Sequence, residues 1–305
     1  MEGKNIDRTK QPAVVIPENV DIAMARSVAL PNGASVYTLE CAETDVGRCS
    51  FVVRAGASWQ NVPFSASAAL NTLSEGAGGM SAQQISERLD FYGSYYDVNI
   101  DCDWCVVTFV CLSKFFDDTL EVARKILLEP DFPEHEVRVY CDKSRQSLTI
   151  NRAKVDFNAR ELFVRSLYGG EHPYGISSPA EAYDALRPSD LRAFYAKHYT
   201  GHNCFVVMSG DTCDDKRDAV AAVAAALPAG EENGRSEFPA PRSVTEARMK
   251  FEGAVQSAIR IGKVMFPRSH RDFIGMQAAT TVVGGYLGSG LVQQLPEQHR
   301  WTDGS

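Results

Sequence analysis

Short apolar runs bounded by turn residues open the chain and predict β-strands. One run lies on each side of Pro31-Asn32-Gly33 within residues 28–39, and a third follows at residues 49–57. Asn-Gly between two apolar runs is typical of a tight hairpin, because both residues tolerate positive φ. Two further runs, at residues 95–100 and 104–112, have the same character. This part of the chain therefore predicts a sheet rich in antiparallel strands.

Helical spacing of apolar residues follows and alternates with these runs. Residues 65–73 are Ala-rich and end before Gly76, a residue suited to the left-handed cap of a helix. Ser81 and Gln84 form a capping-box pattern at the start of the next helix. Further helices are predicted at residues 115–128, at 133–167 with a break near Phe157, and at 214–227. Another helix begins at Pro188 with Ser189 as its N-cap, and a strand is predicted at residues 204–209.

Composition shifts divide the chain into four parts. Residues 1–24 are polar and predict an extended arm, residues 25–228 form the first domain, and residues 229–245 read as a linker rich in Gly, Glu, Asn, Pro and Ser. Residues 246–305 repeat the opening of the first domain, with a strand at 254–266 and a helix near 272–283. We therefore expect an α+β fold of two homologous domains, each an antiparallel-rich sheet with helices packed on one face, the second domain being truncated.

Charge and length exclude some classes of protein. The 305-residue chain has a formal net charge of −8 and no basic cluster, so nothing attracts it to nucleic acid or to an anionic membrane. No run reaches the roughly 18 apolar residues that span a bilayer, and the N-terminus has no signal-peptide core. We expect a cytoplasmic protein, with the periplasm as the alternative if a leader is missing from this sequence.

Several segments resemble one family in their order and spacing. They are Leu30–Gly33, Val53–Ala57, Leu73–Ala77, Ile85–Gly93, Tyr168–Gly175, Leu191–Asp211 and Gly284–Gly304. Together they resemble the pitrilysin/insulinase metallopeptidases, or inverzincins. The branch that looks most similar is that of the short bacterial members related to mitochondrial processing peptidase.

The resemblance breaks where the family binds its metal. Active relatives carry H-x-x-E-H, in which two His bind zinc and the Glu activates a water molecule. The matching helix, within residues 64–76, has Ser67 and Asn71 at the His positions and Leu70 at the Glu position. The third ligand is a Glu on a later helix, and residues 143–155 contain no Asp or Glu. Ser, Asn and Leu are not the ligands that zinc uses in proteins.

The substrate-binding positions of the family also differ in this chain. The resemblance places Pro296 at an Arg that helps to bind substrate, and it places Trp301 and Asp303 at two aromatic positions. The resemblance implies a catalytically inactive subunit without a cofactor. Its partner would be an active zinc peptidase of the same family, which would hold the zinc, and the pair would enclose a peptide substrate. The alternatives are an active zinc metalloendopeptidase with unconventional ligands and a purely structural core-type subunit.

Two histidines four residues apart, His198 and His202, offer a weaker metal signal. The helix that carries His198 ends through Gly201, so the two rings would not share one helix face. No carboxylate lies nearby in the sequence to complete a zinc site. We therefore expect both to be surface histidines.

Overall fold

Two compact units make up the chain in the computed structural model. The structure describes residues 9, 11, 15, 22–41, 44–234, 244, 246–285 and 289–290. The first unit contains residues 1–153 and 177–238, and the second contains residues 154–176 and 239–305. The second unit thus takes residues 154–176 from inside the range predicted for the first domain, and the predicted domain boundaries stay a prediction.

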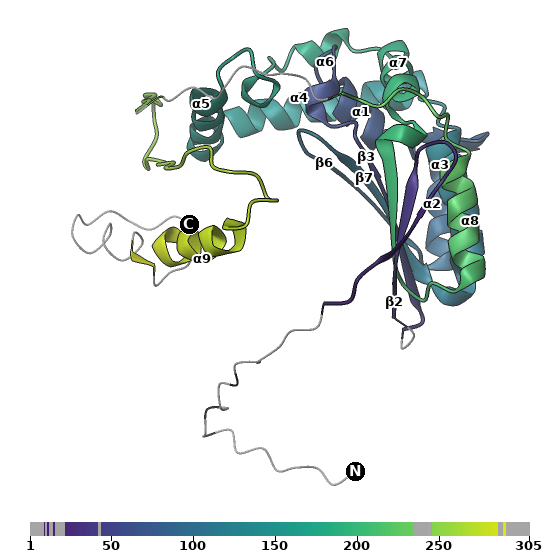
Figure 1. The fold of residues 1–305 in the computed structure, drawn as a ribbon. Coiled ribbons are helices and arrows are strands. Elements are labelled where there is room, and N and C mark those ends of the chain that lie inside the picture. The colour runs from purple at the N-terminus through teal and green to yellow at the C-terminus, as the bar shows by residue number, and fades with distance from the viewer. Residues whose placement is uncertain are drawn as a thin grey trace. The chain divides into compact units, whose positions relative to one another are not determined.

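A six-stranded sheet forms the centre of the first unit (Figure 1). Its order is β1-β2-β8-β3-β7-β6, and every neighbouring pair is antiparallel except β2 and β8. The strands are β1 (Arg26–Ala29), β2 (Ser35–Glu40), β3 (Val46–Val53), β6 (Tyr95–Ile100), β7 (Cys105–Leu112) and β8 (Cys204–Gly210). A separate two-stranded ribbon joins β4 (Gly76–Ala77) to β5 (Met80–Ser81). The strands predicted from the sequence in this unit are therefore confirmed.

Helices cover one face of this sheet and one of its ends (Figure 1). Against the face lie α2 (Ala82–Tyr92), α3 (Phe116–Leu128) and α8 (Asp214–Ala225). At the end lie α1 (Ser65–Asn71), α4 (Glu134–Arg152), α6 (Ala182–Ala185) and α7 (Pro188–His198), with the short turn η1 (Ala57–Trp59) leading into α1. Sheet and helices together confirm the predicted α+β class. None of the described helices has the length and hydropathy needed to cross a bilayer.

The two faces of the sheet differ in burial because side chains alternate along a strand. Phe51, Val107 and Val206 point toward the helices and are at most 1% exposed. Their strand neighbours Val52 and Val106 point to the opposite face and are only half-buried. The core therefore lies between the sheet and one layer of helices, as one-sided antiparallel sheets usually have it.

Helix boundaries follow local signals only in part. The predicted cap at Gly76 is wrong, because α1 ends at Asn71 with Thr72 as its C-cap. Ser81 accepts a hydrogen bond from the backbone N–H of Gln84, whose side chain accepts one in return, so the predicted capping box is confirmed. The predicted N-cap at Ser189 is wrong: Arg187 occupies that position and Pro188 is the first helical residue, where its missing N–H costs nothing.

The described part of the second unit contains the helices α5 (Val155–Tyr168) and α9 (Phe273–Gly284) and the short turn η3 (Pro173–Gly175). His172 caps η3 by accepting a hydrogen bond from the Tyr174 N–H at 3.1 Å. The helix predicted near residues 272–283 is confirmed as α9. Residues 254–266 were predicted as a strand, and that prediction is wrong, since they pair with no strand in the described ranges. Extended backbone becomes a strand only where a second strand takes up its hydrogen bonds.

Apolar side chains of this second unit remain in solvent. In the stretch predicted as a strand, Val255 is 98% exposed and Ile261 is 77% exposed. On α9, Ile274 is 71% exposed, although nearly every residue of that helix is apolar or small. Ile259 and Val264 are also exposed, whereas Phe266 is half-buried.

Candidate functional site

The helix that the resemblance identifies with the family's metal helix is α1, and it is packed tightly into the first unit. Its sequence is Ser-Ala-Ser-Ala-Ala-Leu-Asn, and its alanines at 66, 68 and 69 are each 0% exposed. Small side chains let neighbouring elements approach closely, and α1 contacts α4, α7, β6 and η1. Phe64, just before the helix, has a φ of 66°, an uncommon value for a non-glycine residue. The bend at Phe64 turns the chain directly into α1.

Ser67, Leu70 and Asn71 all lie on this helix, and the two polar side chains among them each donate a hydrogen bond to a nearby carbonyl oxygen. The Ser67 hydroxyl donates to the Phe64 carbonyl oxygen at 3.1 Å. The Asn71 side-chain amide donates to the Ser67 carbonyl oxygen at 2.8 Å. Leu70, at the position of the catalytic Glu, is 0% exposed and belongs to the hydrophobic core. The donors of Ser67 and Asn71 are thus bonded to nearby backbone, while Leu70 fills space inside the protein.

Tyr183 of α6 packs beside this position. Its hydroxyl lies near the side chains of Ser67 on α1 and Ser144 on α4, which both lower its pKa. Its ring stacks on Phe64, with ring centroids 4.0 Å apart and an interplanar angle of 5°. Burial, and then the neighbouring Tyr140, raise the pKa of Tyr183 to about 12, and the Ser67 and Ser144 side chains oppose that rise. The ring of neutral Tyr183 thus contacts Phe64, which precedes α1, and Tyr140 of α4, whose ring centroid is 6.5 Å away.

The residues present do not fit zinc. Ser67 offers a hydroxyl that is already hydrogen-bonded, Asn71 a neutral amide, and Leu70 no donor atom. Across the described ranges, no group of three or more His, Cys, Asp or Glu side chains lies close enough together to hold a metal ion. The predicted substrate positions Pro296, Trp301 and Asp303 lie outside the described residues.

One carboxylate near this helix was not singled out from the sequence. Glu75 lies four residues after α1 and is half-buried. Burial raises the pKa of Glu75, the charge of Glu136 raises it further, and Lys143 opposes both. Glu136 and Lys143 belong to α4, which lies far from Glu75 in the sequence, so no local pattern could have pointed to this group.

The strand β6 forms an edge of the sheet beside α1. In the described part of the chain, it pairs with β7 alone, and α1 contacts it. Its side chains alternate between exposed and half-buried, and Tyr95 is 61% exposed. An edge strand presents unpaired N–H and C=O groups to which an extended peptide can add as a further strand.

One protein-family model matches the second part of the chain. Residues 185–305, under half of the chain, match the family described as the peptidase M16 inactive domain. No curated protein sequence matches this chain.

Solved structures match the fold over most of the chain. A structure described as the peptidase M16 inactive domain from Pseudomonas fluorescens has a TM-score of 0.77 at 21% identity, covering 90% of this chain and 68% of that one. A protease from Helicobacter pylori has a TM-score of 0.70 at 17% identity, covering 92% and 70%. The periplasmic protease PqqL from Escherichia coli has a TM-score of 0.63 at 12% identity, covering 74% and 26%. At these identities the likeness shows that the chain has the fold of the peptidase M16 inactive domain.

Proposed function

We propose that this chain is a catalytically inactive, peptidase-like subunit that pairs with an active zinc peptidase of the same family and helps to enclose a peptide substrate. The observation that carries the proposal is the state of α1. Leu70 is fully buried where a general base would be needed, and the polar groups of Ser67 and Asn71 are hydrogen-bonded within their own helix. The match of residues 185–305 to an M16 family described as inactive supports it.

Peptide binding is supported by the edge of the sheet. Strand β6 lies next to α1 and has an edge without a partner in the described part of the chain. Adding a peptide strand there needs only main-chain hydrogen bonds, so it accepts many sequences. This chemistry suits a subunit that helps to hold unfolded peptides and leaves the cleavage to its partner.

The test of inactivity is metal analysis of the purified protein together with a cleavage assay. We expect less than stoichiometric zinc and no hydrolysis of an unfolded peptide by the chain alone. We also expect cleavage by an H-x-x-E-H peptidase of the same family to rise when this chain is added. Stoichiometric zinc bound through Asn71, with cleavage abolished by EDTA, would refute the proposal and favour an active metalloendopeptidase.

The test of peptide binding is hydrogen exchange with and without an unfolded peptide. We expect amides of β6 to gain protection when the peptide is present. The other edge strand, β1, is the internal control and should not change. Absence of any protection or binding, in a chain that still pairs with the peptidase, would favour a purely structural subunit.

A further inference from the structure

The segment Pro228–Asn233 follows α8, and all of it except Pro228 was predicted to belong to a linker. The structure instead attaches it to the first unit at every described step. The Gly201 N–H donates to the Pro228 carbonyl oxygen at 2.7 Å, and the His202 N–H donates to the Ala229 carbonyl oxygen at 3.2 Å. Gly230 then takes a φ of +64°, with the methyl group of Thr200 too close to admit a side chain at Gly230. We call residues 228–233 the strap.

Asn203 recognises the backbone of the strap through both ends of its side chain. Its amide nitrogen donates to the Glu231 carbonyl oxygen at 3.0 Å, and its oxygen accepts from the Asn233 N–H at 2.7 Å. The same amide nitrogen also donates to the Thr200 hydroxyl at 2.9 Å. Asn203 is 3% exposed, so these bonds form in a water-poor site where leaving them unmade is costly.

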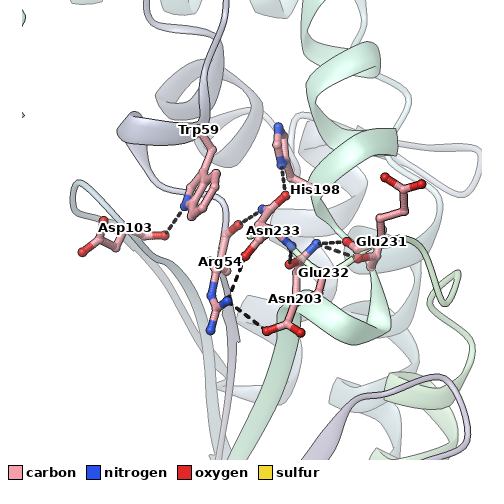
Figure 2. A network of polar contacts seen from close by, with 9 residues as sticks. Arg54, Trp59, Asp103, His198, Asn203, Glu231, Glu232 and Asn233 are labelled. Atoms are coloured by element: carbon pink, nitrogen blue, oxygen red, sulfur yellow. Dashed lines mark hydrogen bonds and ion pairs between the residues drawn. The ribbon is translucent and has the colours of Figure 1, made fainter. Parts of the chain in front are cut away.

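Asn233 joins the strap to two other elements, as Figure 2 shows. Its amide nitrogen donates to the Arg54 carbonyl oxygen at 2.5 Å, so its own oxygen faces Nδ1 of His198 at 3.1 Å. The Arg54 guanidinium donates back to the Asn233 carbonyl oxygen at 3.0 Å and pairs with Glu232. The strap is therefore bonded to the end of β3 and to the end of α7.

His198 occupies the centre of this network. It is 2% exposed, so the prediction that it is a surface histidine is wrong, whereas His202 is exposed as predicted. Because the Asn233 oxygen can only accept, the His198 Nδ1 must carry a hydrogen. The His198 ring lies 6.4 Å from the ring of Trp59, which belongs to η1. The Trp59 indole N–H donates to the Asp103 carbonyl oxygen at 3.1 Å. The network thus reaches the turn that leads into α1.

We propose that the strap is a locally stable segment held in place by the side chains of Asn203 and Asn233, which we call the clasp. Through His198 and Trp59, the clasp couples the attachment of the strap to the position of the η1 turn before α1. The strap can detach from the first unit separately, without unfolding of the rest. When the clasp is broken, the strap detaches while the sheet and α8 stay folded, because neither depends on these hydrogen bonds.

Hydrogen exchange of the full chain, read at single amides, tests the proposal. We compare Asn233→Ala with Asn99→Ala, which makes the same change at an exposed position on β6. In Asn233→Ala we expect the Gly201 and His202 amides, which donate to strap carbonyls, to exchange ~10-fold faster, as the loss of about two hydrogen bonds implies. The amides of α8 and β3, and all amides of Asn99→Ala, should keep their parent rates. Unchanged rates at Gly201 and His202, or equal acceleration throughout the first unit, would overturn the proposal.

A second variant and a second readout separate the clasp from general destabilisation. Asn203→Asp keeps an acceptor for the Asn233 N–H but cannot donate to the Glu231 carbonyl, so we expect acceleration at the same amides without loss of the fold. Nitrogen chemical shifts of neutral His198 should report a hydrogen on Nδ1 in the parent and a return toward the Nε2-protonated form in Asn233→Ala. A parent His198 with its hydrogen on Nε2 would contradict the clasp geometry.

Discussion

Restoring the glutamate of the family motif at position 70 should damage the fold rather than revive catalysis. Leu70 is 0% exposed and lies among the alanines of α1 and the core of the first unit. Leu70→Glu therefore replaces a buried aliphatic side chain with a carboxyl group inside the hydrophobic core. The variant tests whether this position has become part of the core.

The expected cost has two parts. Removing the buried leucine side chain loses about 2 kcal/mol of transfer free energy. Burying a carboxyl group without hydrogen-bond partners costs a further ~2 kcal/mol, even when the group takes up a proton. The sum of about 4 kcal/mol is a large share of the ~5–15 kcal/mol that stabilises a typical folded domain.

The measurement is urea unfolding followed by tryptophan fluorescence. Trp59 and Trp104 both belong to the first unit, so they report on the unit that contains α1. Leu70→Met is the matched control and should cost less than about 1.5 kcal/mol, because it nearly conserves volume and polarity.

The triple variant Ser67→His, Leu70→Glu, Asn71→His extends the test to zinc. We expect it to be at least as unstable as Leu70→Glu, because an imidazole at position 67 also displaces the hydroxyl that Tyr183 contacts. A Leu70→Glu protein within ~1 kcal/mol of the parent would refute the burial argument. A stable triple variant that binds zinc and cleaves peptide would show that α1 has kept the space of a working site.

Three further predictions concern single side chains of the first unit. Burial lowers the pKa of His198 below 6.5, so the unfolded chain binds that proton more tightly. Stability should therefore fall as the pH drops below about 6.5, and pH-dependent unfolding should show a weaker fall in His198→Gln. Tyr183→Phe keeps the ring stack but removes the hydroxyl that lies near Ser67 and Ser144, and urea unfolding should show a loss of about 1 kcal/mol; no loss would mean that this hydroxyl forms no stabilising hydrogen bond with either serine. Ser81→Ala removes the N-cap of α2 and should cost about 1 kcal/mol in the same assay, with Ser81→Asp close to the parent as the control.

Local signals were sufficient for the elements whose stability is local. The hairpin at Asn32-Gly33 and the capping box at Ser81 were predicted correctly, because turns and helix caps depend on residues a few positions apart. The stretch at residues 254–266 shows the limit of such signals. It has the composition of a strand, but a strand exists only with a partner, and the described residues provide none.

The candidate site divides in the same way. The types of residue at Ser67, Leu70 and Asn71 are visible in the sequence, and with them the lack of zinc ligands. The ring contacts of Tyr183 with Phe64 and Tyr140 were not visible, because Tyr183 lies more than forty residues after either of them. Likewise, Asn233 was read as part of a linker, because its partners Arg54, His198 and Asn203 are distant in the sequence.

The sequence by itself determined the alternation of strands and helices, the hairpin at Asn32-Gly33, the cap at Ser81, and the kinds of atom that α1 can offer. Only the tertiary structure decided that Leu70 is core, that the Tyr183 ring contacts Phe64 and Tyr140, and that residues 228–233 are held as a strap. The physical reason is the distance along the sequence over which each interaction acts. Backbone preferences act over a few neighbouring residues, whereas burial and side-chain hydrogen bonds depend on which distant segments the fold brings together.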